Sequence, residues 1–439
     1  MPTLLQGACQ FHSLAVKRGF QVGDRLFRRE KYAKVVKIPA SRKNITHLFA
    51  GMTPLLEAGA ELKAGVGAKQ MTLTRLSLTD FRNHAGADMA AAPGLVALYG
   101  DNGAGKTNIL EAISLLAPGR GLRRAALSDM VRDGASGGFA VFAEVQAGAD
   151  LAPVALGTGI EAAQPGRRIV RINGATAAAT ALGDWLAVLW LTPAMDRLFV
   201  ETAGNRRRFL DRLVLALDPR HAQHSNRYEA ALRARSKLLS DIGQADQQWL
   251  ASLEAQLAEH GAAMDAARQH MLAGLSAELA GQPDAPFARP LLTLVDSEGA
   301  ARTAPYDVEA LKTLFASRRR IDAAAGRATA GPHRDDLSAI HAATGRAAAR
   351  CSTGEQKAML LSLVLAHSDS VARARGQRPV LLLDEVAAHL DPLRRGALYD
   401  RLAGQGGQVW LTGTEAALFD DMPGPVTRFR IAGGRIATG

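Results

Sequence analysis

The sequence predicts an α/β protein in which a mixed sheet is interrupted by an inserted, mainly helical domain. Apolar runs of strand length alternate with helical patterns on both sides of the middle of the chain, and the middle itself loses its strand signals. A glycine-rich loop joins one apolar run to a helix near residue 100. We therefore expect an N-terminal extension over 1–70, a head built from 71–204 and 323–439, and a helical insertion over 205–322.

The composition is that of a folded chain. Of the 439 residues, 47% are hydrophobic and 22% are charged, which excludes a wholly disordered protein. The longest apolar runs, such as residues 360–366, are far shorter than the ~20 residues that a membrane span needs. Two cysteines, Cys9 and Cys351, cannot form a disulfide framework. We therefore expect a cytoplasmic protein that is not associated with a membrane.

The net charge of +11 is concentrated at one end of the chain. Residues 1–70 hold 12 of the 53 Lys and Arg residues but only 4 of the 42 Asp and Glu residues, so the remainder carries only +3. Three interpretations of this segment stay open: upstream sequence translated from a start placed too early, which we favour, a disordered basic arm, or an organelle-type presequence. Its charge is weak evidence that the folded part binds nucleic acid.

The first part of the head has alternating strand and helix patterns. Residues 76–79 alternate in polarity, and the buried run 94–100 leads into the glycine-rich loop. Four apolar residues after the loop recur with helical period: Ile109, Leu110, Ile113 and Leu116. Further strands are expected over 139–145, 167–174 and 186–192, with a hairpin turn at Asn173 and Gly174.

The insertion has the pattern of helices over 206–217, 228–239 and 249–280. In the last of these, apolar residues recur with a spacing near 3.5 over about four heptads, which indicates a short helical arm and not a long coiled coil. These residues are Leu250, Leu253, Leu257, Met264, Met271 and Leu275. After the insertion, strands are expected over 379–386 and 408–414, and a hairpin over 427–437 around Gly433 and Gly434.

The glycine-rich loop carries a phosphate-binding pattern. Residues 100–107 read GDNGAGKT, which fits G-x-x-x-x-G-K-[ST] between a strand and a helix. The glycines let backbone N–H groups face phosphates, Lys106 would reach the β- and γ-phosphates, and the Thr107 hydroxyl would bind Mg²⁺. The expected ATP contacts are Gly100, Asp101, Asn102, Gly103, Ala104, Gly105, Lys106, Thr107 and Asn108.

A second apolar run, LLLDEV, ends in two acids. Asp384 at the end of this strand would bind Mg²⁺, and Glu385 would orient and deprotonate the attacking water. An apolar run that ends in Asp-Glu is common by itself, but together with the phosphate loop upstream it is strong evidence for a nucleotide-binding site. Lys106 and Asp384 are 278 residues apart, which supports an inserted domain between the two halves of one site.

Residues 352–356, Ser-Thr-Gly-Glu-Gln, resemble the signature loop of ABC-type ATPases. The resemblance implies an ABC-type P-loop head in which Ser352 and Gly354 close on the γ-phosphate of ATP bound to a second chain. Asp391, which follows the Asp-Glu pair, resembles part of the D-loop that crosses the same interface. The implied assembly is an ATP-dependent homodimer.

The whole set of motifs resembles the RecF family, the bacterial recombination mediator ATPases related to the SMC proteins. The motifs are LTDFRNH at 78–84, the phosphate loop, RRRFLDRL at 206–213, GPHRDDL at 331–337, STGEQK and LLLDEVAAHLD. The resemblance covers about residues 71–439. The segments 206–213 and 331–337 discriminate most, since ABC transporters lack them.

The resemblance implies a nucleoid-associated ATPase with slow, DNA-stimulated ATP hydrolysis. It would bind double-stranded and single-stranded DNA at gap junctions and act with RecR and RecO in DNA replication, recombinational repair and SOS induction. Two other functions remain open: the ATPase subunit of a transporter and an SMC-type DNA tether. The helical insertion disfavours the transporter subunit, and its short length disfavours the tether.

The sequence departs from the ABC-type pattern at two places. Thr412 and Thr414 occupy the region of the usual histidine, and residues 189–199 contain no glutamine to contact magnesium. Both departures are compatible with weak hydrolysis. Arg82 and Asn83 follow the first strand on a turn that related ATPases place near the nucleotide, and we give this role and simple turn chemistry equal weight.

The GPHRDDL segment has no partner at metal-ligand spacing, so we expect His333 to be a hydrogen-bonded structural residue. Arg334, Asp335 and Asp336 could form ion pairs that hold the returning arm to the head. Six arginines lie at the two ends of the insertion, where DNA phosphate contact and plain solvation are equally favoured. They are Arg206, Arg207, Arg208, Arg318, Arg319 and Arg320.

Overall fold

The computed structural model describes residues 69–439 except 136, 148–151, 241–245, 284 and 439. The chain divides into two units, 1–66 and 67–439, and the fold described below belongs to the second. The three interpretations of the basic N-terminal segment concern residues that lie outside this described part. Among the described residues, no helix is both long and apolar enough to cross a membrane.

The centre of the head is a six-stranded sheet with the order β15-β14-β3-β13-β12-β8. Five neighbouring strands are parallel, and β15 joins the edge as the second strand of an antiparallel hairpin. Strands β8, β12 and β13 are fully buried, which is why they appear in the sequence as continuous apolar runs. The strands are β3 (Leu95–Tyr99), β8 (Val188–Leu191), β12 (Val380–Leu383), β13 (Val409–Gly413), β14 (Val426–Ala432) and β15 (Arg435–Thr438).

A second sheet is mostly antiparallel. Its long strand β1 pairs with β2 and β4, and β5, β6 and β7 continue the sheet as a meander. The predicted turn at Asn173 and Gly174 is confirmed, and both residues have positive φ. The strands are β1 (Lys69–Phe81), β2 (His84–Ala90), β4 (Phe139–Ala147), β5 (Val154–Ile160), β6 (Ile169–Ile172), β7 (Ala175–Thr176) and β11 (Gln377–Arg378), which is parallel to β1.

Helix α4 (Lys106–Ser114) lies between the two sheets and is buried on nearly every side. On the other face of the six-stranded sheet, α11 (Thr353–Arg375) and α12 (Pro392–Gln405) share one hydrophobic core with the base of the insertion. A short helix, α5 (Leu182–Trp185), precedes β8. The mixed α/β class that the sequence predicts is confirmed.

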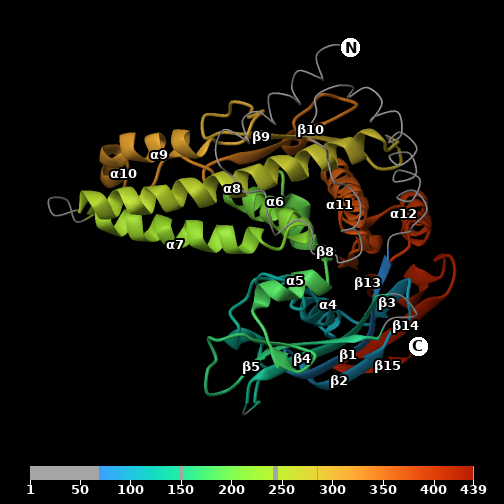
Figure 1. Cartoon of the computed structure of the whole chain (residues 1–439). Helices are drawn as coiled ribbons and strands as arrows, with labels where there is room; N and C mark the ends of the chain where they lie inside the picture. The colour runs from blue at the N-terminus through green and yellow to red at the C-terminus, as the bar shows by residue number, and fades with distance from the viewer. Residues whose placement is uncertain (1–68, 136, 148–151, 241–245, 284, 439) are drawn as a thin grey trace, which may run out of the picture. The chain divides into compact units, whose positions relative to one another are not determined.

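The insertion forms an arm in which α7 and α8 run side by side, with α9 and α10 against them (Figure 1). The six apolar residues of the predicted stripe are all buried in α8. The hydrophobic core of the arm includes Tyr228, Leu257 and Phe315, one from each of three helices. The arm helices are α6 (Ala203–Leu217), α7 (His221–Ser240), α8 (Gln247–Ala280), α9 (Val308–Ser317) and α10 (Arg319–Ala325).

One feature of the insertion differs from its expected helical character. Strand β9 (Pro290–Val295) lies within it and pairs antiparallel with β10 (Asp336–His341), which follows it. The two strands form a sheet of their own, and one face is open, with Leu291 and Ile340 exposed opposite each other. Both strands have six residues, PLLTLV and DLSAIH, and periodicity alone does not distinguish such short segments from parts of helices.

Ion pairs hold the base of the arm to the returning chain. Arg302 binds Asp265 and Asp335, and Arg206 binds Asp336 through two hydrogen bonds of 2.8 and 2.6 Å. The predicted ion pairs of the two aspartates are therefore confirmed. Arg334 has no ion pair within the described part of the chain, so its predicted pairing is wrong.

His333 is a structural residue, as predicted. Its Nε2 lies 3.2 Å from the Ala328 carbonyl, to which only an N–H can donate, so Nδ1 accepts the hydrogen bond from the Tyr228 hydroxyl at 2.7 Å. Burial lowers the pKa of His333 to about 4, so the ring is neutral at pH 7. No cluster of residues able to hold a metal ion occurs among the described residues.

Candidate nucleotide-binding site

The glycine-rich loop lies between the end of β3 and the start of α4. Gly100 and Gly105 both have positive φ. A Cβ at Gly100 would lie 2.1 Å from the Ile431 carbonyl oxygen, and one at Gly105 would lie 2.7 Å from side-chain atoms of Asn83 and His84. Only glycine therefore fits these positions, and the loop turns its backbone toward the helix N-terminus, where anions are favoured.

Lys106 is buried beside this loop and is only 4% exposed. Its ammonium group donates hydrogen bonds to the carbonyl oxygens of Gly100 at 2.6 Å and Asp101 at 2.9 Å. Burial lowers the pKa of Lys106, and the negative charges of Glu385, Asp384 and Asp101 oppose that shift. The lysine is therefore a buried cation whose two hydrogen-bond partners are carbonyl oxygens of the loop and not carboxylates.

The two halves of the predicted site meet at Asp384. Its Oδ1 accepts a hydrogen bond from the Thr107 hydroxyl at 2.9 Å and another from the Thr412 hydroxyl at 2.8 Å. Burial raises the pKa of Asp384, and the two threonine hydroxyls oppose this effect. A hydroxyl and a carboxylate that lie together at the end of the phosphate loop are the hard oxygen ligands that suit Mg²⁺.

Thr412 also connects the two acids, because its Oγ1 accepts a hydrogen bond from the Glu385 backbone N–H at 2.8 Å. Glu385 has φ = 53°, which is rare for a residue other than glycine and stores strain of the kind found at functional sites. Sequence comparison with ABC-type cores marked Thr412 only as standing where a histidine was expected. Its position beside both acids could be found only in the folded chain.

A depression of about 110 Å³ lies against the loop. Its lining includes one residue that the sequence did not single out, Arg123, which binds Glu111 and Asn108 at 3.0 and 2.7 Å. The lining residues are Gly103, Gly105, Lys106, Thr107, Asn108, Arg123 and Glu385. Five of the predicted ATP contacts and the predicted base therefore share one surface.

Arg82 and Asn83 support the loop and α4. Arg82 forms two hydrogen bonds of 2.8 and 2.9 Å with Glu111, whose side chain is fully buried, and a third with the Asp129 carbonyl. Asn83 donates to the Ala104 carbonyl and accepts from the Asn108 amide. Three N–H groups of Arg82 are bound by the protein, which gives this residue a positioning role, and its contact with a nucleotide stays a prediction.

We expect Arg82→Ala to lower the free energy of unfolding by about 2–3 kcal/mol, because it leaves the buried Glu111 with Arg123 as its remaining charged partner. Urea unfolding measures this change. Arg132→Ala is the matched control, because its pair with Asp80 is about one-third exposed and should contribute less than about 1 kcal/mol. A large loss of ATP affinity in Arg82→Ala with unchanged stability would return Arg82 to direct nucleotide contact.

Ser352 and Asp391 begin helices on the surface of the head. Ser352 caps α11 through a capping box, in which its hydroxyl accepts from the Glu355 N–H and the Glu355 carboxylate accepts from the Ser352 N–H. Asp391 caps α12 through the Arg394 N–H at 2.9 Å. Ser352 and Gly354 are exposed, and neither they nor Asp391 line the depression beside the phosphate loop.

The six arginines at the ends of the insertion differ in their contacts. Arg206 is bound to Asp336, Arg207 donates to the Asp335 carbonyl, and Arg319 forms an ion pair with Glu254. These three side chains therefore connect parts of the chain in this structure, and their contact with DNA phosphates stays a prediction. Arg208 and Arg320 are exposed, Arg318 is half-buried, and none of the three has an ion pair among the described residues.

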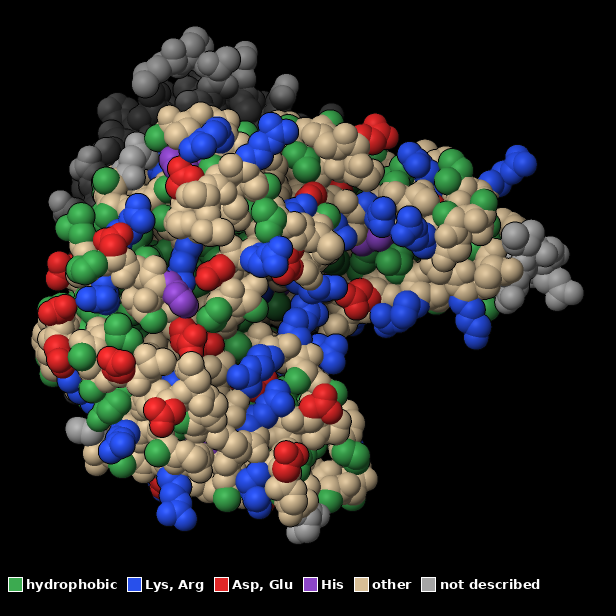
Figure 2. Space-filling model, turned by 180° about the vertical axis from the view of Figure 1, so that it is seen from behind, with side chains coloured by type: hydrophobic (Ala, Val, Ile, Leu, Met, Phe, Trp, Pro, Cys, Tyr) green, Lys and Arg blue, Asp and Glu red, His purple; other side chains and the backbone are tan. Residues whose placement is uncertain are grey.

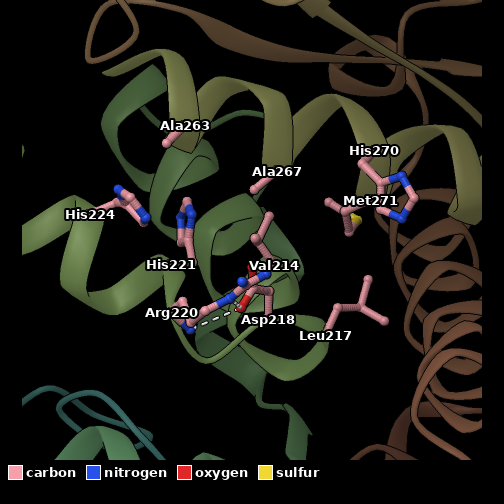
Figure 3. Close-up of a pocket in the computed structure, with 10 residues that line it drawn as sticks. All are labelled: Val214, Leu217, Asp218, Arg220, His221, His224, Ala263, Ala267, His270 and Met271. Carbon is pink, nitrogen blue, oxygen red and sulfur yellow. Dashed lines mark hydrogen bonds and ion pairs between the residues drawn. The ribbon is translucent and has the colours of Figure 1, made fainter. Parts of the chain in front are cut away.

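A larger cavity of about 340 Å³ lies on the arm, among α6, α7 and α8, and Figure 3 shows the residues that line it. Its charged pair, Arg220 and Asp218, is bound to itself, and the remaining lining is mostly apolar or imidazole. It holds neither a phosphate loop nor paired acids. The smaller depression beside Lys106 is the site that brings the phosphate loop together with the predicted catalytic acid.

Comparisons with known proteins agree with this geometry. The family model described as the RecF/RecN/SMC N-terminal domain matches residues 72–431. The DNA replication and repair protein RecF of Rhizobium johnstonii is 48% identical over 385 residues, which covers 84% of this chain and 99% of that protein. The protein of the same name from Caulobacter vibrioides is 47% identical over 379 residues, which covers 83% and 98%.

The fold has a solved counterpart. A structure described as the recombination mediator protein RecF with ATPrS in the RecFOR pathway matches with a TM-score of 0.75 and 24% identity. The match covers 85% of this chain and 99% of that one, and at this identity it supports the fold alone. From the identity and coverage of its relatives, this chain belongs to the RecF family.

Proposed function

We propose that this chain is an ATP-dependent, DNA-binding recombination mediator that acts in the cytoplasm at single-strand gaps. It serves DNA replication, recombinational repair and SOS induction together with RecR and RecO, binds duplex and single-stranded DNA, and hydrolyses ATP slowly. The observation that carries the proposal is the contact of Thr107 and Asp384 beside Lys106 and Glu385. The names of its relatives favour this function over a transporter ATPase or an SMC-type tether.

The residues of the site fit Mg²⁺ and ATP. Thr107 and Asp384 would hold the metal, which neutralises phosphate charge when it is bound. Lys106 and the loop N–H groups would hold the phosphates, and Gly100 and Gly105 allow the close approach of the backbone. Glu385 would accept a proton from the attacking water, with its backbone fixed through Thr412.

The second part of the site would come from another copy of the chain. Ser352, Gly354 and Asp391 do not line the depression of their own chain, and the serine and glycine are exposed at the start of α11. The N-terminus of that helix favours negative charge. We therefore propose an ATP-dependent homodimer in which these residues face the γ-phosphate of the partner chain, so that ATP occupancy controls the grip on DNA.

Binding of a gapped duplex should tighten at least tenfold when ATP and Mg²⁺ are added together, because the closed dimer presents two DNA-binding surfaces at once. Fluorescence anisotropy measures the affinity, for the full chain and for a chain that begins at Gly67. The shorter chain separates the charge of the N-terminal segment from the action of the head and arm. Equal affinity with and without nucleotide in both chains would refute the proposed function.

A further inference from the structure

Four arginines at the junction of head and arm lack a carboxylate partner. Arg120 and Arg124 lie in the segment after α4, and Arg208 and Arg212 lie on α6. No ion pair of these four occurs among the described residues, whereas the neighbouring Arg123 and Arg206 are each bound to an acid. At this junction, some arginine charges are therefore neutralised by carboxylates, and the charges of the four arginines named above are not neutralised by any described residue.

The Arg212 guanidinium is buried without a carboxylate partner among the described residues, which costs free energy. Its guanidinium lies 4.5 Å from the centroid of the Trp190 ring and 5.0 Å from that of Phe209. One N–H group contacts the Met195 sulfur at 3.4 Å, while Nε is buried without a hydrogen-bond partner. Burial and, to a smaller extent, the positive charge of Arg124 together lower the pKa of Arg212 to about 9. Burying a cation without a counterion costs free energy, and an anion bound nearby would offset this cost.

Arg124 connects this buried group to the surface. Burial lowers its pKa, and the positive charges of Arg208 and Arg120 lower it further, so the three side chains lie close enough to repel one another. Two acids oppose the shift, Glu229 and Asp211. Both acids are engaged elsewhere, because Glu229 pairs with Arg233 at 3.6 Å and Asp211 binds Arg268 through two hydrogen bonds.

The cluster lies where a long polyanion could reach it. Arg120, Arg124 and Arg208 are exposed, and Figure 2 shows Lys and Arg side chains gathered in the hollow where the arm meets the head. The cluster joins the segment that follows the phosphate-loop helix to the first helix of the arm. Its aromatic neighbours, Trp190 and Phe209, are buried and cannot stack on bases.

We propose that Arg120, Arg124 and Arg208, with Arg212 behind them, form a phosphate-binding surface that takes the backbone of double-stranded DNA. Guanidinium groups bind phosphate oxygens in pairs, and because the aromatic rings beside Arg212 are buried, the contact with DNA is independent of sequence. The surface deepens the proposed function and rests on it. Only Arg208 belongs both to this surface and to the arginines for which the sequence predicted DNA contact.

The test is the salt dependence of duplex binding by full-length Arg124→Ala/Arg208→Ala with ATP and Mg²⁺. Each lost phosphate contact removes about 0.9 from the slope of log affinity against log salt concentration, so the slope should become shallower by about 2. The affinity at low salt should fall by about 10- to 100-fold. The matched control is Arg75→Ala/Arg220→Ala, which also removes two positive charges but from the surface pairs with Asp88 and Asp218.

Normal ATP binding and melting temperature in the double variant exclude a folding defect. An unchanged salt slope, with duplex binding by the parent chain intact, overturns this surface and leaves the proposed function standing. A parent chain that binds no duplex overturns the proposed function and the surface with it. If the double variant loses affinity for inorganic phosphate while its duplex affinity and salt slope stay those of the parent, the cluster binds free phosphate and the duplex assignment is overturned.

Discussion

Lys106→Met should abolish ATP-dependent dimerisation. The lysine ammonium is the one buried cation among the side chains that line the depression, and charge-assisted hydrogen bonds to phosphate contribute about 1.5–3 kcal/mol. Its loss should weaken ATP binding by about 10- to 150-fold, which at moderate ATP concentrations leaves the chain without nucleotide. Isothermal titration calorimetry measures the affinity, and sedimentation velocity with and without ATP measures the dimer.

The methionine keeps the length and apolar stem of lysine, so the fold should tolerate it. Lys312→Met is the matched control, because Lys312 lies on α9 of the arm and, within the described part of the chain, forms its ion pair with the exposed Glu309 alone. That variant should bind ATP and dimerise like the parent. Dimers that form equally well in Lys106→Met and in the parent at the same ATP concentration would show that the phosphate loop does not control assembly.

The phosphate loop and the Asp-Glu strand could be predicted because their signals are local. A strand buried on both faces is an apolar run, and glycines at positive φ are irreplaceable at fixed positions in the loop. The pairing of Thr107 with Asp384 follows once the loop after β3 and the end of β12 are placed at the same edge of one sheet, with β13 between the two strands. Local chemistry therefore predicted the site over a separation of 277 residues.

The roles of the arginines could not be predicted in the same way. The charge of an arginine is visible in the sequence, but its partner is not. Arg82 is bound to Glu111, 29 residues away, and Arg206 to Asp336, 130 residues away. From the sequence, arginines are chosen for DNA contact because they stand in runs along the chain. In the folded chain, the arginines available to bind phosphate are those without a nearby carboxylate. The same reason explains why Arg123 and Arg124 were missed, although they are adjacent.

The second large effect is expected for Glu385→Gln. Glutamine keeps the size of the side chain but cannot accept the proton of the attacking water, and loss of a general base slows hydrolysis by about 10²- to 10⁴-fold. The Thr107–Asp384 contact and Lys106 are untouched, so ATP affinity should stay near that of the parent. Phosphate release measures hydrolysis, and sedimentation with ATP, Mg²⁺ and duplex DNA measures the dimer.

Because binding survives while turnover stops, Glu385→Gln should accumulate as an ATP-bound dimer on duplex, the opposite outcome to Lys106→Met. Comparing the two variants separates the effect of ATP binding from the effect of ATP hydrolysis, which neither variant does alone. Glu298→Gln, in an exposed turn of the arm, removes the same charge and should behave like the parent. If Glu385→Gln hydrolyses ATP at the parental rate, the base is another group, and the strained backbone of Glu385 would have to be explained by its hydrogen bond to Thr412 alone.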